Sequence, residues 1–214
     1  HQKWEGSNKD LFNCIDDAYT SGEAKVAVSG GTFVDFDPNV SPEQKVDGKT
    51  PSFAAPGVGI TKNEDGSFTA IADMKAQILD AAGNSVKAYG SLAEAIEAAK
   101  DGQTVALLAD VEQNSQLTIN KNITLDLNQM IVTGSFVING DVTIQNGTIN
   151  VPDGETNFAY GSLILKNVDI TGTAVSSSLL SVNNNGNVTV DKNSTIVANS
   201  AKGANPAVFI KGQD

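Results

Sequence analysis

Arginine is absent from this sequence of 214 residues, and histidine and cysteine occur once each, as His1 and Cys14. All fourteen basic side chains are therefore lysines. Arginine is the side chain that clamps carboxylate and phosphate groups through two parallel hydrogen bonds, and imidazole is the commonest proton shuttle at neutral pH. Their scarcity argues against most enzyme mechanisms. No histidine besides the terminal one is present to activate a thiolate, so we interpret Cys14 as a buried, inert thiol.

Positive charge is also scarce. Twenty-five acidic residues oppose the fourteen lysines, which gives a formal net charge of −11. Nucleic acids bind to clustered basic side chains that displace counterions, and anionic membrane surfaces attract the same kind of cluster, but no such cluster is present. No apolar run approaches the roughly 20 residues that a membrane-spanning helix requires. We therefore expect no nucleic-acid partner and no membrane insertion.

The two ends of the sequence resemble cut ends. The chain begins HQKWEGSNKD, without an initiator methionine or a signal peptide, and it ends at KGQD directly after the strand-like AVFIKG. We expect a fragment or mature piece of a longer protein whose targeting signal lies elsewhere.

Residues 1–73 predict a small mixed segment that we interpret as the end of a preceding module. A short helix is expected at 8–22, an interrupted strand at 25–36 and a loop rich in proline, glycine and serine at 37–57. Residues 58–72 alternate around Asp65-Gly66, which is a hairpin signal.

Residues 74–102 predict a second hairpin followed by an amphipathic helix. The hairpin consists of AQILD, the turn AAGNS and VKAYG, and the helix is SLAEAIEAAKDG at 91–102. Ser91 and Glu94 have the spacing of a capping box. Leu92, Ile96 and Ala99 lie on one face of the helix, and Asp101-Gly102 ends it. We expect this helix to cap whatever follows it.

Residues 103–214 contain short apolar runs that recur at steps of 18 to 26 residues. A first series comprises Val105/Leu107, Ile123/Leu125, Val142/Ile144, Leu163/Leu165 and Val188/Val190. A second comprises Ile131, Ile149, Ile170 and Ile196, and a third comprises Leu117/Ile119, Phe136/Ile138, Leu179/Leu180 and Val208/Ile210. Three series in step indicate that each turn of the chain carries three short strands.

Coiling lets such short strands bury their apolar faces. Stacking successive turns about 4.8 Å apart pairs each strand with its equivalents above and below, and the inward Ile, Val and Leu side chains form continuous ladders. Glycine and asparagine suit the corners, as in Asn139-Gly140, Asn146-Gly147 and Asn185-Gly186. The extra residues of longer repeats are expected in loops near 153–160, 172–178 and 199–206. The sequence from about Ala76 therefore predicts a mainly β fold, a right-handed parallel β-solenoid, rather than a β-sandwich.

These residues resemble a known superfamily. KAYGSLAEAIEAAKDGQTVALLADV resembles the entry module of a pectate-lyase-like right-handed β-helix, and LTINKNITLDLNQMIVTGSFVINGDVTIQNGTI resembles its first coils, most closely those of surface-protein versions. Gln129-Met130 replaces the usual Gly-Lys of the family at one corner. The segment VSGGTFVDFDPNVSPE…SFAAPGVGITKNEDGSFTA resembles a piece that closes such solenoids in large secreted bacterial and phage proteins. The fold hosts enzymes, adhesins and viral spikes alike.

The resemblance to lyases implies clustered acids that hold calcium and a basic residue that removes a proton. The solenoid acids Asp126, Asp141, Asp169 and Asp191 instead occur one to a turn, with no clear pair, and Lys166 and Lys192 are expected to be solvated. Asp35–Asn39 departs from a calcium loop at its sixth and twelfth positions. The sequons at Asn122, Asn146, Asn187 and Asn193 fit corner and ladder asparagines. We therefore expect no catalytic, cofactor or metal site.

The favoured interpretation is a non-enzymatic extracellular module of a bacterial surface protein. Such an adhesin-like stalk would bind carbohydrate or a host or bacterial surface protein through its loops, such as Asn183–Asn185, and its flat faces. A phage tail spike or head fibre, expected to be a homotrimer, is the first alternative, and a polysaccharide lyase-like fragment is the second.

Overall fold

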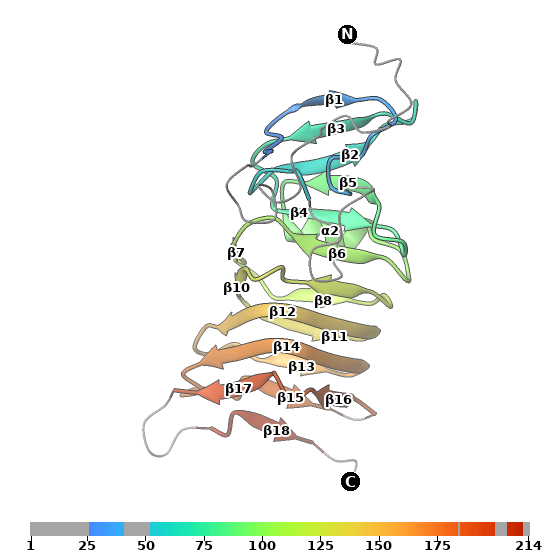
Figure 1. The fold of residues 1–214 in the computed structure, drawn as a ribbon. Coiled ribbons are helices and arrows are strands. Elements are labelled where there is room, and N and C mark those ends of the chain that lie inside the picture. The colour runs from blue at the N-terminus through green and yellow to red at the C-terminus, as the bar shows by residue number, and fades with distance from the viewer. Residues whose placement is uncertain (1–25, 41–51, 184, 200–204, 212–214) are drawn as a thin grey trace.

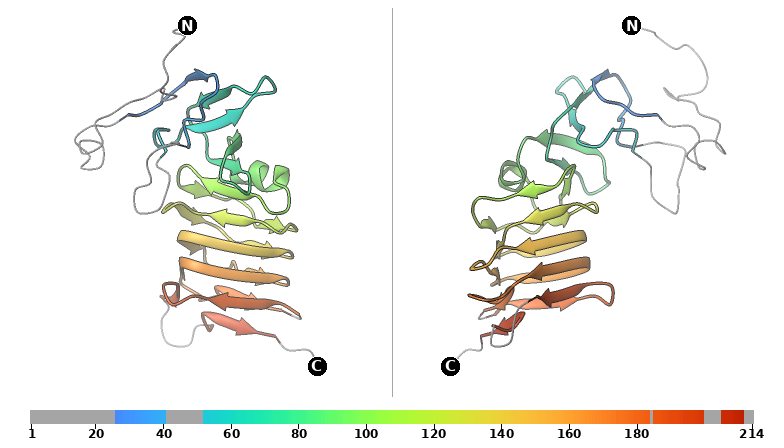
Figure 2. Two further views of the ribbon diagram at one scale, coloured as in Figure 1. Left: turned by 45° about the vertical axis from the view of Figure 1, so that its right-hand side comes forward. Right: turned by 90° about the vertical axis from the view of Figure 1, so that its left-hand side faces the viewer.

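The computed structural model describes residues 26–40, 52–183, 185–199 and 205–211, and most of these form a parallel β-solenoid of about four turns (Figure 1). The predicted helix at 8–22 lies outside the described residues, as do His1 and Cys14. The coils stack in one direction from the N-terminal segment to the C-terminal end (Figure 2). β12 and β14 run along the near side and the chain returns behind them as it descends, which is a right-handed coil (Figure 1).

Each turn carries three short strands, and equivalent strands stack into three faces. The first face contains β6 (Thr104–Leu107), β9 (Thr124–Asp126), the first halves of β12 (Asp141–Val151) and β14 (Ser162–Gly172), and β16 (Asn187–Val190). The second contains β7 (Val111–Glu112), β10 (Ile131–Thr133), the second halves of β12 and β14, and β17 (Thr195–Ala198). The third contains β8 (Leu117–Ile119), β11 (Phe136–Ile138), β13 (Asn157–Ala159), β15 (Leu180–Val182) and β18 (Val208–Ile210).

The three predicted apolar series are confirmed as ladders, with three corrections to the register. On the first face Val105 aligns with Leu125, two residues from the Ile123 that the sequence pattern paired with it, and Ile144, Leu165 and Val190 continue the ladder. On the second face Val132 is the inward residue, aligned with Ile149, whereas the predicted Ile131 is 43% exposed. On the third face Val182, rather than the predicted Leu179, accompanies Leu180 and aligns with Ile210. This ladder also includes Asn157 and Ala159 of β13, a strand that lies where the sequence predicted a loop at 153–160.

The last coil is less buried than the predicted inward pattern requires. Ile123, Leu125, Val142, Ile144, Leu163 and Leu165 are buried, as expected. Val188 is only partly buried against the core and Val190 is 43% exposed. Both residues lie in β16, the last strand of its sheet, so among the described residues no further coil covers them.

Corners of the solenoid use two different residue properties. Asn146 and Asn185 have positive φ angles, as predicted, and so do Asn128, Gln129 and Asn167. At the predicted corner Asn139-Gly140 neither residue has a positive φ, and the requirement is close approach instead. A Cβ on Gly161 would lie 2.3 Å from the carbonyl oxygen of Gly140. Gly140 and Gly186 are crowded in the same way by Lys121 and Ala159, so stacked glycines let successive coils meet there.

A helix and a hairpin cover the N-terminal end of the solenoid. The hairpin of β4 (Ala76–Leu79) and β5 (Ser85–Tyr89) adds antiparallel to β6. α2 (Leu92–Ala98) buries Leu92, Ala95 and Ile96 in the solenoid core, together with the residue that follows it, Ala99. The hydroxyl of Ser91 accepts a hydrogen bond from the backbone amide of Glu94, as expected for a helix cap, and donates one to the Glu94 carboxylate. The helix ends at Ala98, before the predicted Asp101-Gly102, although Gly102 has a positive φ.

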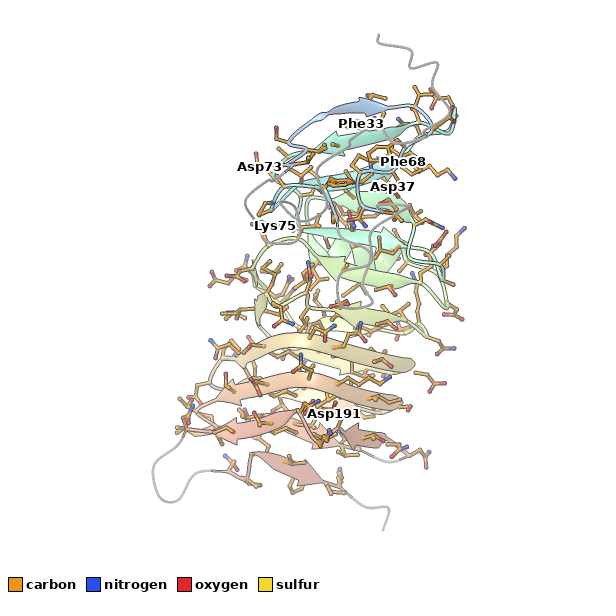
Figure 3. All side chains as sticks on the ribbon, viewed as in Figure 1. Phe33, Asp37, Phe68, Asp73, Lys75 and Asp191 are labelled. Atoms are coloured by element: carbon orange, nitrogen blue, oxygen red, sulfur yellow. The ribbon has the colours of Figure 1, made fainter. Side chains whose placement is uncertain are left out.

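A second, smaller apolar cluster lies on the far side of this cover. The predicted hairpin at 58–72 is confirmed as β2 (Gly59–Lys62) and β3 (Phe68–Ile71), and β1 (Gly31–Phe33) joins it with Phe33 opposite Phe68 (Figure 3). Of the predicted strand at 25–36, the structure forms only Gly31–Phe33, and Asp35 adopts a positive φ beyond its C-terminal end. Asp37 anchors the segment, since its carboxylate accepts from the amide and hydroxyl of Ser85. The module boundaries after residues 73 and 102 stay predictions.

Candidate functional site

The outer surface of the third face presents the most exposed aromatic surface of the described solenoid. Strands on this face are three residues long, and in β8, β11 and β13 the first and third side chains point into the core while the middle one points outward. In β18, the last strand of the face, all three side chains are exposed. The outward middle residues align in register as Thr118, Val137, Phe158, Ser181 and Phe209. Phe209 is 48% exposed, and Ser181 between the two phenylalanines is buried.

A second column follows directly after the strands of this face. Its residues share one backbone pattern, in which the amide of each donates to a carbonyl oxygen of the preceding coil; they are Asn139, Tyr160, Asn183 and Lys211. Asn120, the equivalent residue of the first coil, completes the column. Tyr160 is 47% exposed, and its ring centroid lies 6.2 Å from that of Phe158, with 27° between the ring planes. The two aromatic rings therefore form one platform.

Amide side chains flank this platform on the coils before and after it. Asn139 precedes Tyr160, and its Nδ2 donates to Oδ1 of Asn120 over 2.7 Å. Asn183 follows Tyr160, and its Nδ2 lies 3.3 Å from the hydroxyl of Ser181. Each amide carries two donor hydrogens and an acceptor, so these contacts leave capacity for a ligand. An aromatic surface beside amide donors and acceptors suits a ligand with an apolar face and hydroxyl groups at its edge.

The solenoid acids are not brought together. Asp126 and Asp191 lie in one column, but Gln145 and Lys166 separate them, so they are three coils and about 14 Å apart. Asp141 lies at the other end of its strand, where its amide donates to Asn122. Asp169 lies on the second face and accepts from the hydroxyl of Thr195 over 2.5 Å. Lys166 and Lys192 are exposed.

Hydrogen bonds within the coils occupy the carboxylates of Asp126 and Asp191. Asp126 accepts from the backbone amide of Asn128 and from the side chains of Gln145 and Asn146. The hydroxyl of Ser194 and the amide of Asn167 hold the pKa of Asp191 below its ordinary value (Figure 3). A general acid at neutral pH requires a raised carboxyl pKa, so this shift is opposite to the one that catalysis needs.

Two open hollows interrupt the surface near the N-terminal cover. One, of about 480 Å³, lies between Ala54–Val58, Gln77 and the corner at Asn128. The other, of about 820 Å³, lies beside the start of α2 and is lined by Lys75, Asp110, Glu112 and Ser115.

Other sequence features lie in structural positions. Asn122 and Asn146 of the predicted sequons bond to Asp141 and Asp126 at corners, and Asn187 and Asn193 are exposed. No group of three or more His, Cys, Asp and Glu in the described ranges is placed to hold a metal ion. Likewise, the described part of the chain has no helix that is long and apolar enough to cross a membrane.

The aromatic platform was not predicted from the sequence. The available signal was NFAY at 157–160, in which two aromatic residues alternate with a small apolar one.

Comparison with protein-family models, with curated proteins and with solved structures gave no match. The structure shows the β-solenoid fold. The resemblance to pectate-lyase-like, adhesin and phage proteins stays a prediction.

Proposed function

We propose that this chain is a non-catalytic, extracellular β-solenoid module that binds carbohydrate through the outer surface of its third face. The observation that carries the proposal is the ring pair of half-buried Phe158 and exposed Tyr160, flanked by Asn139 and Asn183. The apolar C–H face of a sugar ring packs against an aromatic ring, and its hydroxyl groups bond to amides at the rim. An elongated solenoid also suits a stalk that holds such a face away from a surface.

The non-catalytic part of the proposal is supported by the side-chain inventory. The chain has no arginine and only a terminal histidine, and the solenoid acids lie on different faces, at opposite ends of adjacent strands or several coils apart. Glycoside hydrolysis requires two carboxyl groups roughly 5–10 Å apart, which the separation of Asp126 and Asp191 exceeds. The extracellular location is supported by the acidic composition with a single cysteine.

A glycan-binding measurement with matched variants tests the proposal. The full chain is applied to an array of plant, microbial and host polysaccharides, and each bound glycan is then titrated by calorimetry. Tyr160→Ala and Phe158→Ala should each weaken binding roughly tenfold, because each removes half of the platform. Thr189→Ala, an exposed outward substitution in β16 on the first face, is the control and should bind like the parent. Absence of binding to every glycan, or equal binding by all variants, would refute the proposal.

A further inference from the structure

The binding groups of the third face are arranged in columns along the solenoid axis, which constrains the direction of a ligand. On the coil of β13 the outward aromatic side chains are Phe158, in the middle of the three-residue strand, and Tyr160, directly after it. Across the strands the column continues through Asn120, Asn139, Tyr160, Asn183 and Lys211. Successive members lie about 4.8 Å apart, so four steps extend about 19 Å.

The same columns are almost free of charge. Among the described residues, Lys211 at the last position is the only charged member, although the chain as a whole has a net charge of −11. The ammonium group of the neighbouring Lys121 is directed to the carbonyl oxygens at the end of α2. A polyanion such as a uronide would therefore meet few cations on this face and an overall negative field around the protein.

From these two observations, and resting on the proposed function, we propose that the third face binds a linear, neutral polysaccharide that lies along the solenoid axis. One sugar stacks on the Phe158–Tyr160 platform. Its neighbours on either side bond to the amides of Asn139 and Asn183, because a linked pyranose advances by about one coil spacing. About four consecutive sugars therefore span the column from Asn120 to Asn183.

A chain-length series tests the direction of binding. Calorimetric titrations of the full chain with neutral β-linked gluco- and manno-oligosaccharides of two to six residues should show affinity that rises to about four residues and then levels off. Asn139→Ala and Asn183→Ala should each weaken tetrasaccharide binding by roughly three- to tenfold, as expected for loss of one hydrogen bond. Their effect on the disaccharide should be smaller. Asn150→Ala, at an exposed position on the second face, is the matched control, and melting curves confirm that each variant is folded.

A parallel series with galacturonate oligosaccharides and with increasing salt tests the neutral character. We expect neutral ligands to bind more tightly and with little dependence on salt, since few charges are involved. Tighter, salt-sensitive binding of the uronides would overturn this inference and leave the proposed carbohydrate-binding function standing. If the affinity for neutral oligosaccharides stops rising at the disaccharide, and Asn139→Ala and Asn183→Ala leave it unchanged, the axial direction of binding alone is overturned. If no oligosaccharide or polysaccharide binds, the proposed function and this inference fail together.

Discussion

The ammonium nitrogen of Lys121 lies 3.3 Å from the carbonyl oxygen of Ile96, in the last turn of α2, and it also contacts the carbonyl of Glu97. The last carbonyls of a helix have no partner within the helix and carry partial negative charge. Lys121 itself lies at the corner of the first coil, in the column that continues as Gly140, Gly161 and Gly186. One side chain therefore joins the capping helix to the solenoid.

Replacement of this lysine should loosen the cap. We expect Lys121→Met to lower the free energy of unfolding by about 1–2 kcal/mol, because carbonyls of α2 lose a charged donor. Lys100→Met, at an exposed position just after α2, is the control and should change stability little. Urea unfolding provides the measurement, and equal midpoints for the two variants would show that the contact does not stabilise the cap.

A pair of neighbouring residues tests the corrected register of the second face. Val132 is fully buried, so Val132→Asp places an unpaired charge between coils and should cost several kcal/mol of stability. Ile131 is 43% exposed, so Ile131→Asp should cost less than about 1 kcal/mol. Thermal melting measures the stability of both variants. If Ile131→Asp is the more destabilising of the two, Ile131 is the inward residue, as the sequence pattern predicted. Ile144→Asp, at a buried position of the first face, should be as damaging as Val132→Asp.

The stacked glycines provide a test of coil spacing. Gly161→Ala places a methyl group 2.3 Å from the carbonyl oxygen of Gly140, which successive coils can relieve only by moving apart. Overpacking of this kind costs about 1–3 kcal/mol. Gly90→Ala is a suitable comparison, since nothing lies within 4 Å of the added carbon. Two variants of equal stability would mean that the corner accommodates a side chain.

Removal of the cap should expose the solenoid interior. A protein lacking residues 76–102 leaves β6 without its antiparallel neighbour and uncovers the apolar core that α2 buries. Unpaired strand edges promote association between chains, so we expect insoluble protein or oligomers in size-exclusion chromatography. The full chain measured alongside is the reference. A truncated protein that stays monomeric and folded would contradict a capping role.

The lowered pKa of Asp191 predicts an acid-sensitive corner. Its pKa is depressed first by the hydroxyl of Ser194 and then by the amide of Asn167, so folding favours the ionised carboxylate. The resulting stabilisation is complete above the ordinary carboxyl pKa of about 4 and is lost as the pH falls through the lower folded value. Chemical unfolding of the parent and of Asp191→Asn should therefore diverge above about pH 4 and converge in stronger acid. If the difference in stability between the parent and Asp191→Asn does not change with pH, the lowered pKa of Asp191 is not its cause.

Sequence alone determined the architecture of this protein. Recurrent pairs such as Val142/Ile144 and Leu163/Leu165 must be buried, and strands too short to bury them singly can do so only by stacking. The capping helix was equally predictable, because Ser91 and the stripe of Leu92 and Ile96 are local signals that need no distant partner. Both predictions depend on burial, which constrains residue type strongly.

Only the tertiary structure decided the register and the candidate binding face. A corner that holds one residue more or fewer reverses which side chains point inward, so the choice between Ile131 and Val132 depends on the positive φ angles at Asn128 and Gln129. Outward positions carry no burial constraint and leave no periodic trace in the sequence. Tyr160 is therefore aligned with Asn139 and Asn183, 21 and 23 residues away, only because the coils of the folded chain stack them in one column.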